Sequence, residues 1–274
     1  MNKDSLGDRM KANYEDAYRI KLPKRMPILI RLDGVAWHSL TKRLNKPIDG
    51  NLVSVMNDTA KYLCENIQGV QLAYLQSDEI SLLICNYKDI NSQSWFDGNL
   101  QKMVSVAASM ASAYFTANSW KIFRVSKIVT FDARAFVLPK EEVCNALLWR
   151  QQDATRNSIQ MLARSLYSHK QCNNKSCSEL QELIFKKGIN WNDCPASQKR
   201  GRCIVKQTTE KEAINAITGE VTKVMRSAWV VDDNIPIFSQ NRDYIDDHVF
   251  FFGEKPPLIT KEKTPEATAN QPTT

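Results

Sequence analysis

Two carboxylates in the chain are candidates to hold a divalent cation. Asp33 ends an apolar run in the stretch ILIRLDGVAWH, and Asp78 lies between two apolar runs in LAYLQSDEISLLI. Like charges at close range are costly unless a cation lies between them, and Mg²⁺ prefers oxygen ligands such as carboxylates and substrate phosphates. Gly34 has no side chain, so its carbonyl can approach a second ion. These residue types indicate phosphoryl transfer with two magnesium ions, the logic of a polymerase palm, if the fold joins the two segments.

The hydrophobic pattern predicts how the two segments meet. Apolar runs of strand length predict strands, and apolar residues at three- and four-residue steps predict helices. In order, the elements are strand 27–33, helix 51–67, strands 70–77 and 79–85, helix 99–118 and strand 127–138. This β-α-β-β-α-β order predicts an α+β, ferredoxin-like polymerase palm, an antiparallel sheet with helices on one face. Its first and third strands are central, so Asp33 should lie beside the turn that carries Asp78.

The second half of the chain reads as an extension of this unit. Residues 141–168 are expected to form one long helix or two, and Ser176 with Glu179 forms a capping box for a shorter helix. Residues 202–206 and 227–231 could pair as a late hairpin. We therefore expect three parts, which are a palm-like catalytic domain (1–139), a helical and hairpin extension packed on it (140–254), and a disordered tail (255–274).

Composition narrows the class of protein. The 274 residues are 43% hydrophobic and 24% charged, as in a globular protein with one large domain or a domain and a lobe. The net charge of +7 favours anionic partners such as nucleotides or nucleic acid. Scattered cysteines and the lack of a signal sequence predict a cytoplasmic protein, and no apolar run approaches the ~20 residues that span a bilayer. His169, Cys172 and Cys177 do not have the spacing of a zinc site.

Six short motifs resemble those of one family. RLDGVAWHSLT, KPIDG, LAYLQSDEISLLI, FDARAFVLP, WRQQDATRN and GINWN…QKRG follow the order seen in the tRNA-His guanylyltransferase family and its guanylyltransferase-like relatives. Members are similar to polymerase palms that add nucleotides to the 5′ end of tRNA in the 3′-5′ direction. The resemblance implies that ATP or GTP activates the 5′-monophosphate of tRNA, and that the 3′-hydroxyl of an incoming GTP attacks the activated phosphate. Pyrophosphate is then removed.

The resemblance also implies roles for individual residues. Asp33 and Asp78 match the catalytic carboxylates that hold two Mg²⁺ ions, together with the Gly34 carbonyl. Lys46 and Lys102 match basic positions of the activation step. The other matched nucleotide-binding positions are Val35, Ala36, Trp37, His38 and Ser77. Since members of the family usually assemble as dimers of dimers, a homo-oligomer, dimer or tetramer, is expected.

Several residues have rival interpretations. His38 could be a partly buried structural histidine, Trp37 could belong to the core instead of stacking on a base, and Lys102 could be solvated on its helix. Glu79 is expected to shape the turn rather than bind a metal. The residues expected to contact tRNA are Arg150, Asn157, Lys199 and Arg200.

Two stretches depart from the enzymes that select tRNA-His. Those enzymes carry His-Ile-Asn-Asn where this chain has TRNS at 155–158, and a basic cluster where it has DGN at 97–99. Both changes resemble the guanylyltransferase-like branch, which favours template-directed repair of 5′-truncated tRNAs. The natural tRNA substrate is therefore left open between tRNA-His guanylylation and general 5′ repair.

Two other classes of protein stay open. A palm-fold nucleotide cyclase would need a second nucleotide pocket in place of an RNA surface, and the chain has no Gly-Gly-Asp/Glu-Glu-Phe motif. A non-catalytic RNA-binding module with ferredoxin-like topology would show aromatic-rich central strands. The predicted central strands here carry Asp33, Asp78 and Glu79 instead.

Overall fold

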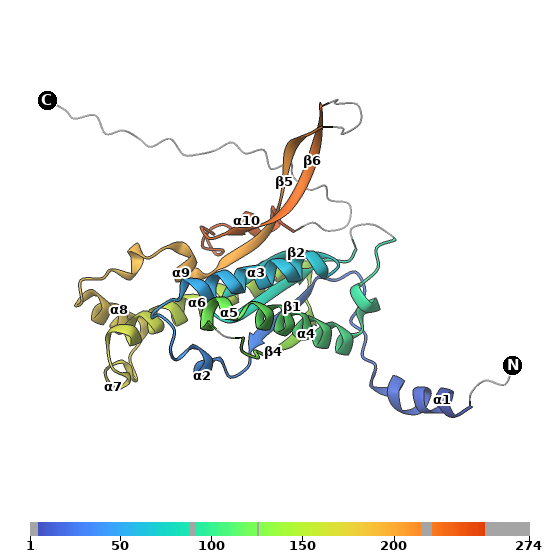
Figure 1. The fold of residues 1–274 in the computed structure, drawn as a ribbon, viewed down its shortest axis with the longest axis horizontal. Coiled ribbons are helices and arrows are strands. Elements are labelled where there is room, and N and C mark those ends of the chain that lie inside the picture. The colour runs from blue at the N-terminus through green and yellow to red at the C-terminus, as the bar shows by residue number, and fades with distance from the viewer. Residues whose placement is uncertain (1–4, 88–90, 125, 215–220, 250–274) are drawn as a thin grey trace.

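The computed structural model describes residues 5–87, 91–124, 126–214 and 221–249. A six-stranded sheet with the order β4-β1-β3-β2-β5-β6 forms its centre, and all neighbouring strands are antiparallel (Figure 1). The strands are β1 (Ile28–Gly34), β2 (Val70–Gln76), β3 (Glu79–Ile84), β4 (Phe131–Val137), β5 (Arg202–Ile214) and β6 (Val221–Asp232). The first four confirm the predicted β-α-β-β-α-β unit, in which β1 and β3 lie between β4 and β2.

The late hairpin is longer than the sequence pattern indicated, and it belongs to the same sheet. Strand β5 pairs with β2 through Leu72–Leu75, so the extension continues the sheet of the palm-like unit. Beyond that pairing, β5 and β6 continue as a two-stranded arm that leaves the body of the molecule (Figure 1). The division of the chain at residue 139 stays a prediction, because the two parts share one sheet.

Helices α3 (Gly50–Asn66) and α4 (Leu100–Asn118) cover one face of the sheet (Figure 1). Both begin at a side-chain cap: Asp49 accepts hydrogen bonds from the backbone at Asn51 and Leu52, and Asn99 accepts one from Lys102. Their apolar side chains pack in one core with the strands, and its fully buried members include Met56, Leu63, Met103, Phe115, Ile30 and Leu82. The expectation of two helices on this face is confirmed.

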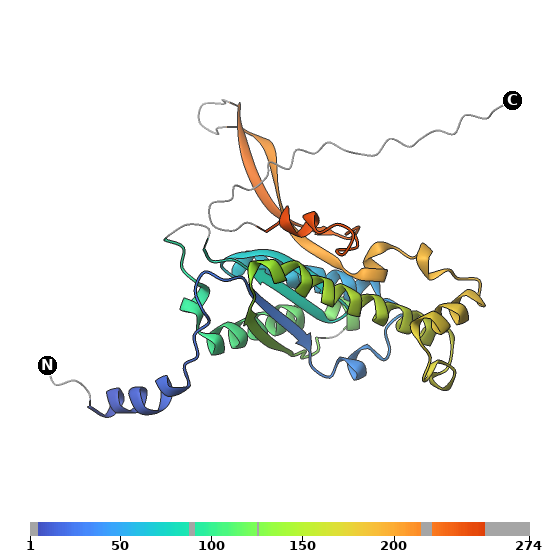
Figure 2. The same ribbon diagram turned by 180° about the vertical axis from the view of Figure 1, so that it is seen from behind.

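Helix α6 (Val143–Leu166) crosses the opposite face as one continuous helix (Figure 2). It buries Leu147 against Leu72, Tyr74 and Leu83 of the sheet in a second core. Gln151 of α6 also holds the segment after β6, because its amide donates to the Pro236 carbonyl at 2.8 Å and accepts from the Phe238 nitrogen at 2.9 Å. Helix α10 (Asp243–Asp246) completes this layer.

The end of α6 carries a small satellite core. Helices α7 (His169–Cys172), α8 (Cys177–Phe185) and α9 (Ala196–Arg200) follow it, and Leu180 and Ile184 pack on Ile159 and Ala163. The predicted capping box is present, since Ser176 and Glu179 bond to each other's backbone at the start of α8. Cys172 is buried among these apolar groups, and the described residues contain no cluster of three or more His, Cys, Asp or Glu side chains able to hold a metal.

Three short helices lie outside the main layers. They are α1 (Ser5–Met10), α2 (Trp37–Thr41) and α5 (Trp120–Phe123). Figures 1 and 2 show α1 projecting away from the body at the end of an extended linker. The predicted disordered tail, 255–274, lies outside the described residues. None of the helices that the structure describes is long and apolar enough to cross a membrane.

The turn after β1 requires a glycine at residue 34. A Cβ atom there would lie 2.2 Å from Nε1 of Trp37. Trp37 is 4% exposed, and its ring centroid lies 4.9 Å from that of Phe115 and 5.3 Å from that of Phe131. The core interpretation of Trp37 is therefore confirmed, and its side chain is not available to stack on a base.

This contact predicts that Gly34→Ala destabilises the fold by about 1–3 kcal/mol, because the tryptophan must shift to admit the methyl group. The matched control is Gly50→Ala at the first position of α3, where a Cβ meets nothing within 4 Å. That substitution should be neutral or stabilise by up to about 1 kcal/mol. Urea unfolding of both variants is the measurement, and equal effects would contradict the proposed contact.

Candidate active site

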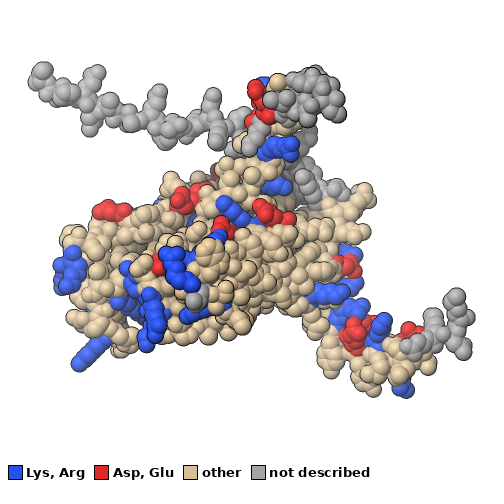
Figure 3. All heavy atoms as spheres, viewed as in Figure 1, with Lys and Arg blue, Asp and Glu red and all other residues tan. Residues whose placement is uncertain are grey.

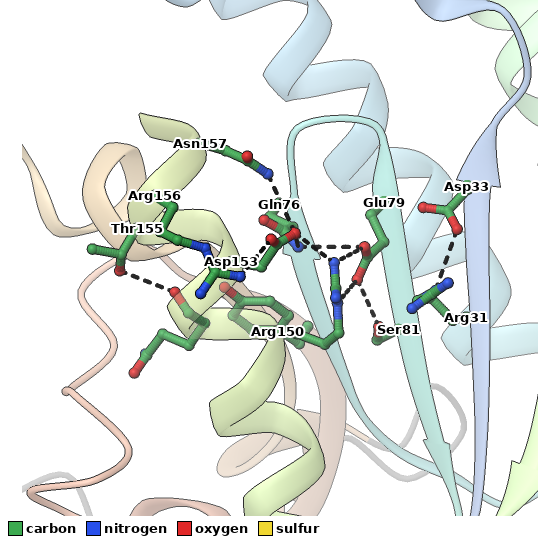
Figure 4. Close-up of polar contacts among 12 residues, drawn as sticks. Arg31, Asp33, Gln76, Glu79, Ser81, Arg150, Asp153, Thr155, Arg156 and Asn157 are labelled. Atoms are coloured by element: carbon green, nitrogen blue, oxygen red, sulfur yellow. Dashed lines mark hydrogen bonds and ion pairs between the residues drawn. The ribbon is translucent and has the colours of Figure 1, made fainter. Parts of the chain in front are cut away.

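Two rows of polar side chains cross the face of the sheet that α6 covers only in part. The first row is made of residues that the strand register places side by side on β4, β1, β3 and β2, namely Asp132, Asp33, Glu79 and Gln76. The second row, two residues along each strand, holds Arg134, Arg31 and Ser81. Side chains two residues apart point to the same face of a strand, so the carboxylates of the first row lie next to the two guanidinium groups of the second. Figure 4 shows Asp33, Glu79, Arg31 and Ser81 of these rows.

Asp33 lies between two arginines. Its Oδ2 accepts a hydrogen bond from Nη1 of Arg134 at 3.1 Å and pairs with Nε of Arg31 at 3.2 Å. The arginines face each other on antiparallel strands, where like charges repel, and the carboxylate relieves that repulsion. Sequence reasoning missed both arginines, although the alternation in RLD and DAR was the signal that places them on the face of Asp33. The Arg134 side chain is 56% exposed and so accessible to a substrate.

The Glu79 carboxylate accepts hydrogen bonds from side chains of α6 and of the β2–β3 hairpin (Figure 4). Arg150 donates from Nε to Oε1 at 2.7 Å and from Nη2 to Oε2 at 2.5 Å, and both residues are 6% exposed. Ser81 and Gln76 donate to the same carboxylate at 3.2 and 3.3 Å. Burial raises the pKa of Glu79, while the bond to Arg150 acts in the opposite sense. These contacts agree with a turn-shaping role for Glu79.

Arg150 was expected to contact tRNA, but its side chain is hydrogen-bonded to carboxylates of the protein instead. Its guanidinium faces inward, where Glu79 and Asp153 both accept its hydrogen bonds, the latter at 2.8 Å. Asp153 also accepts from Arg156 at 2.9 Å and from Asn157 at 3.3 Å. Burial opposes the ionisation of Asp153, but Arg156 and Arg150 lower its pKa. A buried ion-pair network therefore fixes α6 against the β2–β3 hairpin, and Arg150 belongs to this network where it borders the second cavity.

Asp78, in the turn between β2 and β3, is an acidic group of this edge that forms no ion pair with the described residues. Its carbonyl accepts a hydrogen bond from the Gly34 nitrogen at 3.2 Å, which joins the turn to the end of β1. Burial raises the pKa of Asp78, and the negative charge of Asp33 adds to this effect. No ion pair to Asp78 is present in the part of the chain that the structure describes. An uncompensated carboxylate facing a second carboxylate is a fit for a hard cation.

Two cavities flank the Asp78 turn and share part of their walls. The first measures ≈ 320 Å³ and lies between the segment that leads into α3 and helices α6 and α9, with Lys46 and Asp49 in its lining. The second measures ≈ 280 Å³ and contains Asp33, Asp78 and Glu79. The residues common to both cavities are Gln76, Ser77, Asn157 and Met161. One elongated ligand could therefore occupy both.

Most of the expected nucleotide-binding positions meet at this place. Asp33, Lys46, Ser77 and Asp78 line one or both cavities, and Asn157, which was expected to contact tRNA, lines both. The turn formed by residues 34–36 lies next to them, with Ala36 in the left-handed region at φ 59°. The side chain that follows this turn, His38, is exposed, so the interpretation as a buried structural histidine is wrong.

Lys102, Lys199 and Arg200 lie apart from the carboxylates. Lys102 is exposed in the first turn of α4, whereas Ser112 of that helix bonds to Phe131 beside the Gly34 turn. Ten residues of helix, about 15 Å, separate the two. Lys199 donates to the Asn192 carbonyl and lies over the Trp191 ring at 5.7 Å. The Arg200 carbonyl accepts from the Tyr74 hydroxyl at 2.7 Å. Lys102 is thus distant from the carboxylates, whereas Lys199 and Arg200 belong to α9, which borders the first cavity, and their role as tRNA contacts stays a prediction.

A palm-like sheet with acidic groups at the ends of its central strands, beside cavities of nucleotide size, defines a nucleotidyltransferase. The family described as tRNAHis guanylyltransferase (Thg1) matches residues 7–139. A solved bacterial tRNA(His) guanylyltransferase (Thg1)-like protein in complex with ATP is 46% identical, with a TM-score of 0.80 over 90% of this chain and 100% of that chain. Its counterpart in complex with GTP is also 46% identical over the same shares of both chains, with a TM-score of 0.76.

A more distant relative agrees with this assignment. The tRNA(His) guanylyltransferase of Debaryomyces hansenii is 28% identical over 66% of this chain and 73% of its own length. The chain belongs to the tRNAHis guanylyltransferase (Thg1) family and is a nucleotidyltransferase that adds nucleotides to the 5′ end of tRNA. The resemblance seen in the motifs is confirmed, and the interpretations as a cyclase or a non-catalytic module are set aside.

The two central carboxylates should respond differently to neutralisation when no divalent cation is present. Because folding raises the pKa of Asp78, the folded state binds more protons than the unfolded state between the two pKa values. The free energy of unfolding therefore falls as the pH rises through that window. Asp78→Asn removes the penalty and should raise the melting temperature at neutral pH, with a difference that disappears below about pH 4.

Asp33→Asn is the matched comparison, since it gives up the contacts to Arg31 and Arg134 and should not stabilise. Thermal melts in the presence of a chelator, over a series of pH values, give both results. If Asp33→Asn stabilises as much as Asp78→Asn, the assignment of Asp78 as the uncompensated group is wrong.

The buried pair of Glu79 and Arg150 should behave as one unit. Glu79→Leu leaves a buried guanidinium with only Asp153 as an acidic partner, so we expect a loss of about 3–5 kcal/mol in the free energy of unfolding. Adding Arg150→Met should restore much of this loss, because neither charge is then buried alone. A double-mutant cycle by chemical unfolding measures the coupling, and strictly additive effects would show that the two side chains are independent.

Proposed function

We propose that this enzyme activates the 5′-phosphate of tRNA with ATP or GTP and extends the tRNA in the 3′-5′ direction with the help of two Mg²⁺ ions. The observation that carries the proposal is the uncompensated Asp78 facing Asp33 beside two joined cavities. Solved Thg1-like proteins with 46% identity are complexes with ATP and GTP, which supports the choice of nucleotides.

The donor set suits magnesium. Asp33, Asp78 and the Gly34 carbonyl would supply only oxygen ligands, which is the preference of Mg²⁺. When bound, the ions supply neutralisation of the charge on the reacting phosphates. Arg134 is exposed beside Asp33 and is placed to hold a phosphate oxygen. Lys46 adds a second positive charge near the site, since it is exposed and lines the first cavity.

Basic residues near the site support the binding of tRNA. Figure 3 shows Lys and Arg gathered on the side of the molecule where Figure 1 places α2 and α5. The basic residues in or next to these helices are Lys42, Arg43, Lys121 and Arg124. Contacts between such groups and phosphates supply most of the affinity for nucleic acid without reading its sequence. The adjacent Lys46 would lead this surface into the active site.

The exposed N-terminal helix supports self-association. Leu6, Met10 and Tyr14 recur every four residues and are 58%, 48% and 59% exposed. Such an apolar stripe on a projecting helix is covered in most proteins by another chain. We infer a homo-oligomer, dimer or tetramer, which acts in the cytoplasm.

The two stretches that differ from tRNA-His-selective enzymes, TRNS and DGN, favour template-directed repair of 5′-truncated tRNAs. Thr155 bonds back to the Gln151 carbonyl at 3.0 Å, so it does not point toward a ligand as the first residue of TRNS. Asp97 of DGN forms ion pairs with Lys21 and Lys24. It therefore holds the N-terminal linker and is not available to contact tRNA. With fewer groups to read tRNA-His, base pairing of the incoming nucleotide must supply more of the selectivity.

The deciding measurement is nucleotide incorporation on several 5′-truncated tRNAs, each with its templating base varied. We expect the Watson–Crick partner to be added at each position and addition to stop when the acceptor stem is complete. Asp78→Asn is the inactive control, since it removes one of the two acidic ligands, and omission of Mg²⁺ should have the same effect. Addition of a single guanosine only to tRNA-His, whatever base stands opposite, would instead identify a dedicated tRNA-His enzyme.

A further inference from the structure

Arg202, the first residue of β5, is a buried cation without an anionic partner. Its side chain is 4% exposed, and burial lowers its pKa to about 10. Nε donates to the side-chain oxygen of Asn57, while Nη2 has no hydrogen-bond partner among the residues that the structure describes. No carboxylate in that part of the chain forms an ion pair with it. A buried charge with unmade hydrogen bonds is expensive, so the position indicates a missing polar partner.

The missing partner can be located, because Arg202 borders the first cavity. It pairs with Leu75 of β2, three residues before Asp78, and so lies behind the turn that carries the catalytic carboxylate. The rest of this cavity is largely apolar, with a lining that includes Leu44, Ile48, Leu52, Val53, Met161 and Trp191. Lys46, the other basic residue of the described lining, is exposed, whereas Arg202 is buried.

The two cavities would hold different parts of one nucleotide. Phosphates belong next to Asp33 and Asp78 in the second cavity, where cations would neutralise them. A nucleotide that passes the shared residues Ser77 and Asn157 then places its base in the first cavity. Mostly apolar walls with a few buried polar groups, here Asp49, Gln76 and Arg202, are the usual composition of a ligand pocket. Arg202 therefore faces the base and not the triphosphate.

We propose that Arg202 donates hydrogen bonds to the O6 and N7 acceptors of guanine and thereby makes this pocket select GTP over ATP. The inference rests on the proposed nucleotide site and adds a residue that determines its specificity. Guanine presents two neighbouring acceptors that match the fork of a guanidinium. Adenine has an amino donor in place of O6, so it would leave one guanidinium donor buried against another donor.

The test is calorimetric titration of the full chain, with Mg²⁺ present, using GTP, ATP, guanosine and inorganic triphosphate. In Arg202→Met, which keeps an unbranched apolar stem but lacks the guanidinium donors, the affinity for GTP and guanosine should fall roughly 10- to 100-fold. The affinity for inorganic triphosphate should not change, and the affinity for ATP should not fall, because the clash between the guanidinium and the adenine amino group is removed. Inosine triphosphate keeps O6 and N7 and should lose as much as GTP, whereas 7-deaza-GTP lacks N7 and should lose less. Arg226→Met, on the exposed strand β6, is the control that should behave as wild type.

Each of the following results would overturn the assignment. Equal losses for ATP and GTP, or a loss for inorganic triphosphate, would show that Arg202 binds phosphate. Unchanged GTP affinity in Arg202→Met would show no contact and would leave the proposed function intact. If the wild-type protein binds no GTP, the proposed function fails as well.

The fold of the variant is checked separately by thermal unfolding. Arg202→Met removes a buried charge and should melt no lower than wild type. Arg202→Lys keeps the charge but not the fork of donors, so it should lose the preference for GTP over ATP while still binding triphosphate as wild type does. Retention of the full preference in Arg202→Lys would contradict readout by a bidentate contact.

Discussion

Three carboxylates stand side by side across β4, β1 and β3, and the rest of the site depends on how their charge is compensated. Asp132 and Asp33 face arginines of the neighbouring row, and Glu79 is buried against Arg150. The compensation does not extend to Asp78, which lies in the turn one residue before Glu79. Because the other carboxylates are already satisfied, the unmet negative charge of this edge is concentrated where the cavities open, which is the charge distribution that a divalent cation and a triphosphate require.

The same compensation explains why the extension cannot be separated from the palm-like unit. The cation for Glu79 comes from α6, and Asp153 of that helix then organises Arg156 and Asn157 at the cavity walls. Strand β5 adds to the edge of β2 and brings Arg202 behind the turn. Loss of α6 would leave a buried carboxylate without its cation and would open both cavities at once. The candidate nucleotide site is therefore formed at the interface between the two halves of the chain.

The two stretches that differ from tRNA-His-selective enzymes have structural contacts of their own. The DGN loop holds the linker to α1 through Asp97, with Lys21 and Lys24 as its partners, and Thr155 bonds within α6. Of the two stretches, only TRNS reaches the site, through Asn157, which lines both cavities. The proposed repair activity would take its selectivity from the nucleotide pocket and from pairing with the template.

Local patterns in the sequence were sufficient for much of this architecture. Apolar alternation located β1 to β4, helical spacing located α3, α4 and α6, and the strand order alone brought Asp33 next to Asp78, because these features depend on residues close in the chain. The pairing of Glu79 with Arg150, 71 residues away, and the distance of Lys102 from the site depend on packing between elements, which no local pattern encodes. The same holds for Trp37, which is buried because rings from α4 and β4 pack against it. It also holds for Arg202, which becomes buried only when β5 pairs with β2. Residue type and spacing determined which groups could take part in chemistry. The tertiary structure decided which of these groups are paired within the protein and which line the cavities, because that depends on contacts between elements distant in the chain.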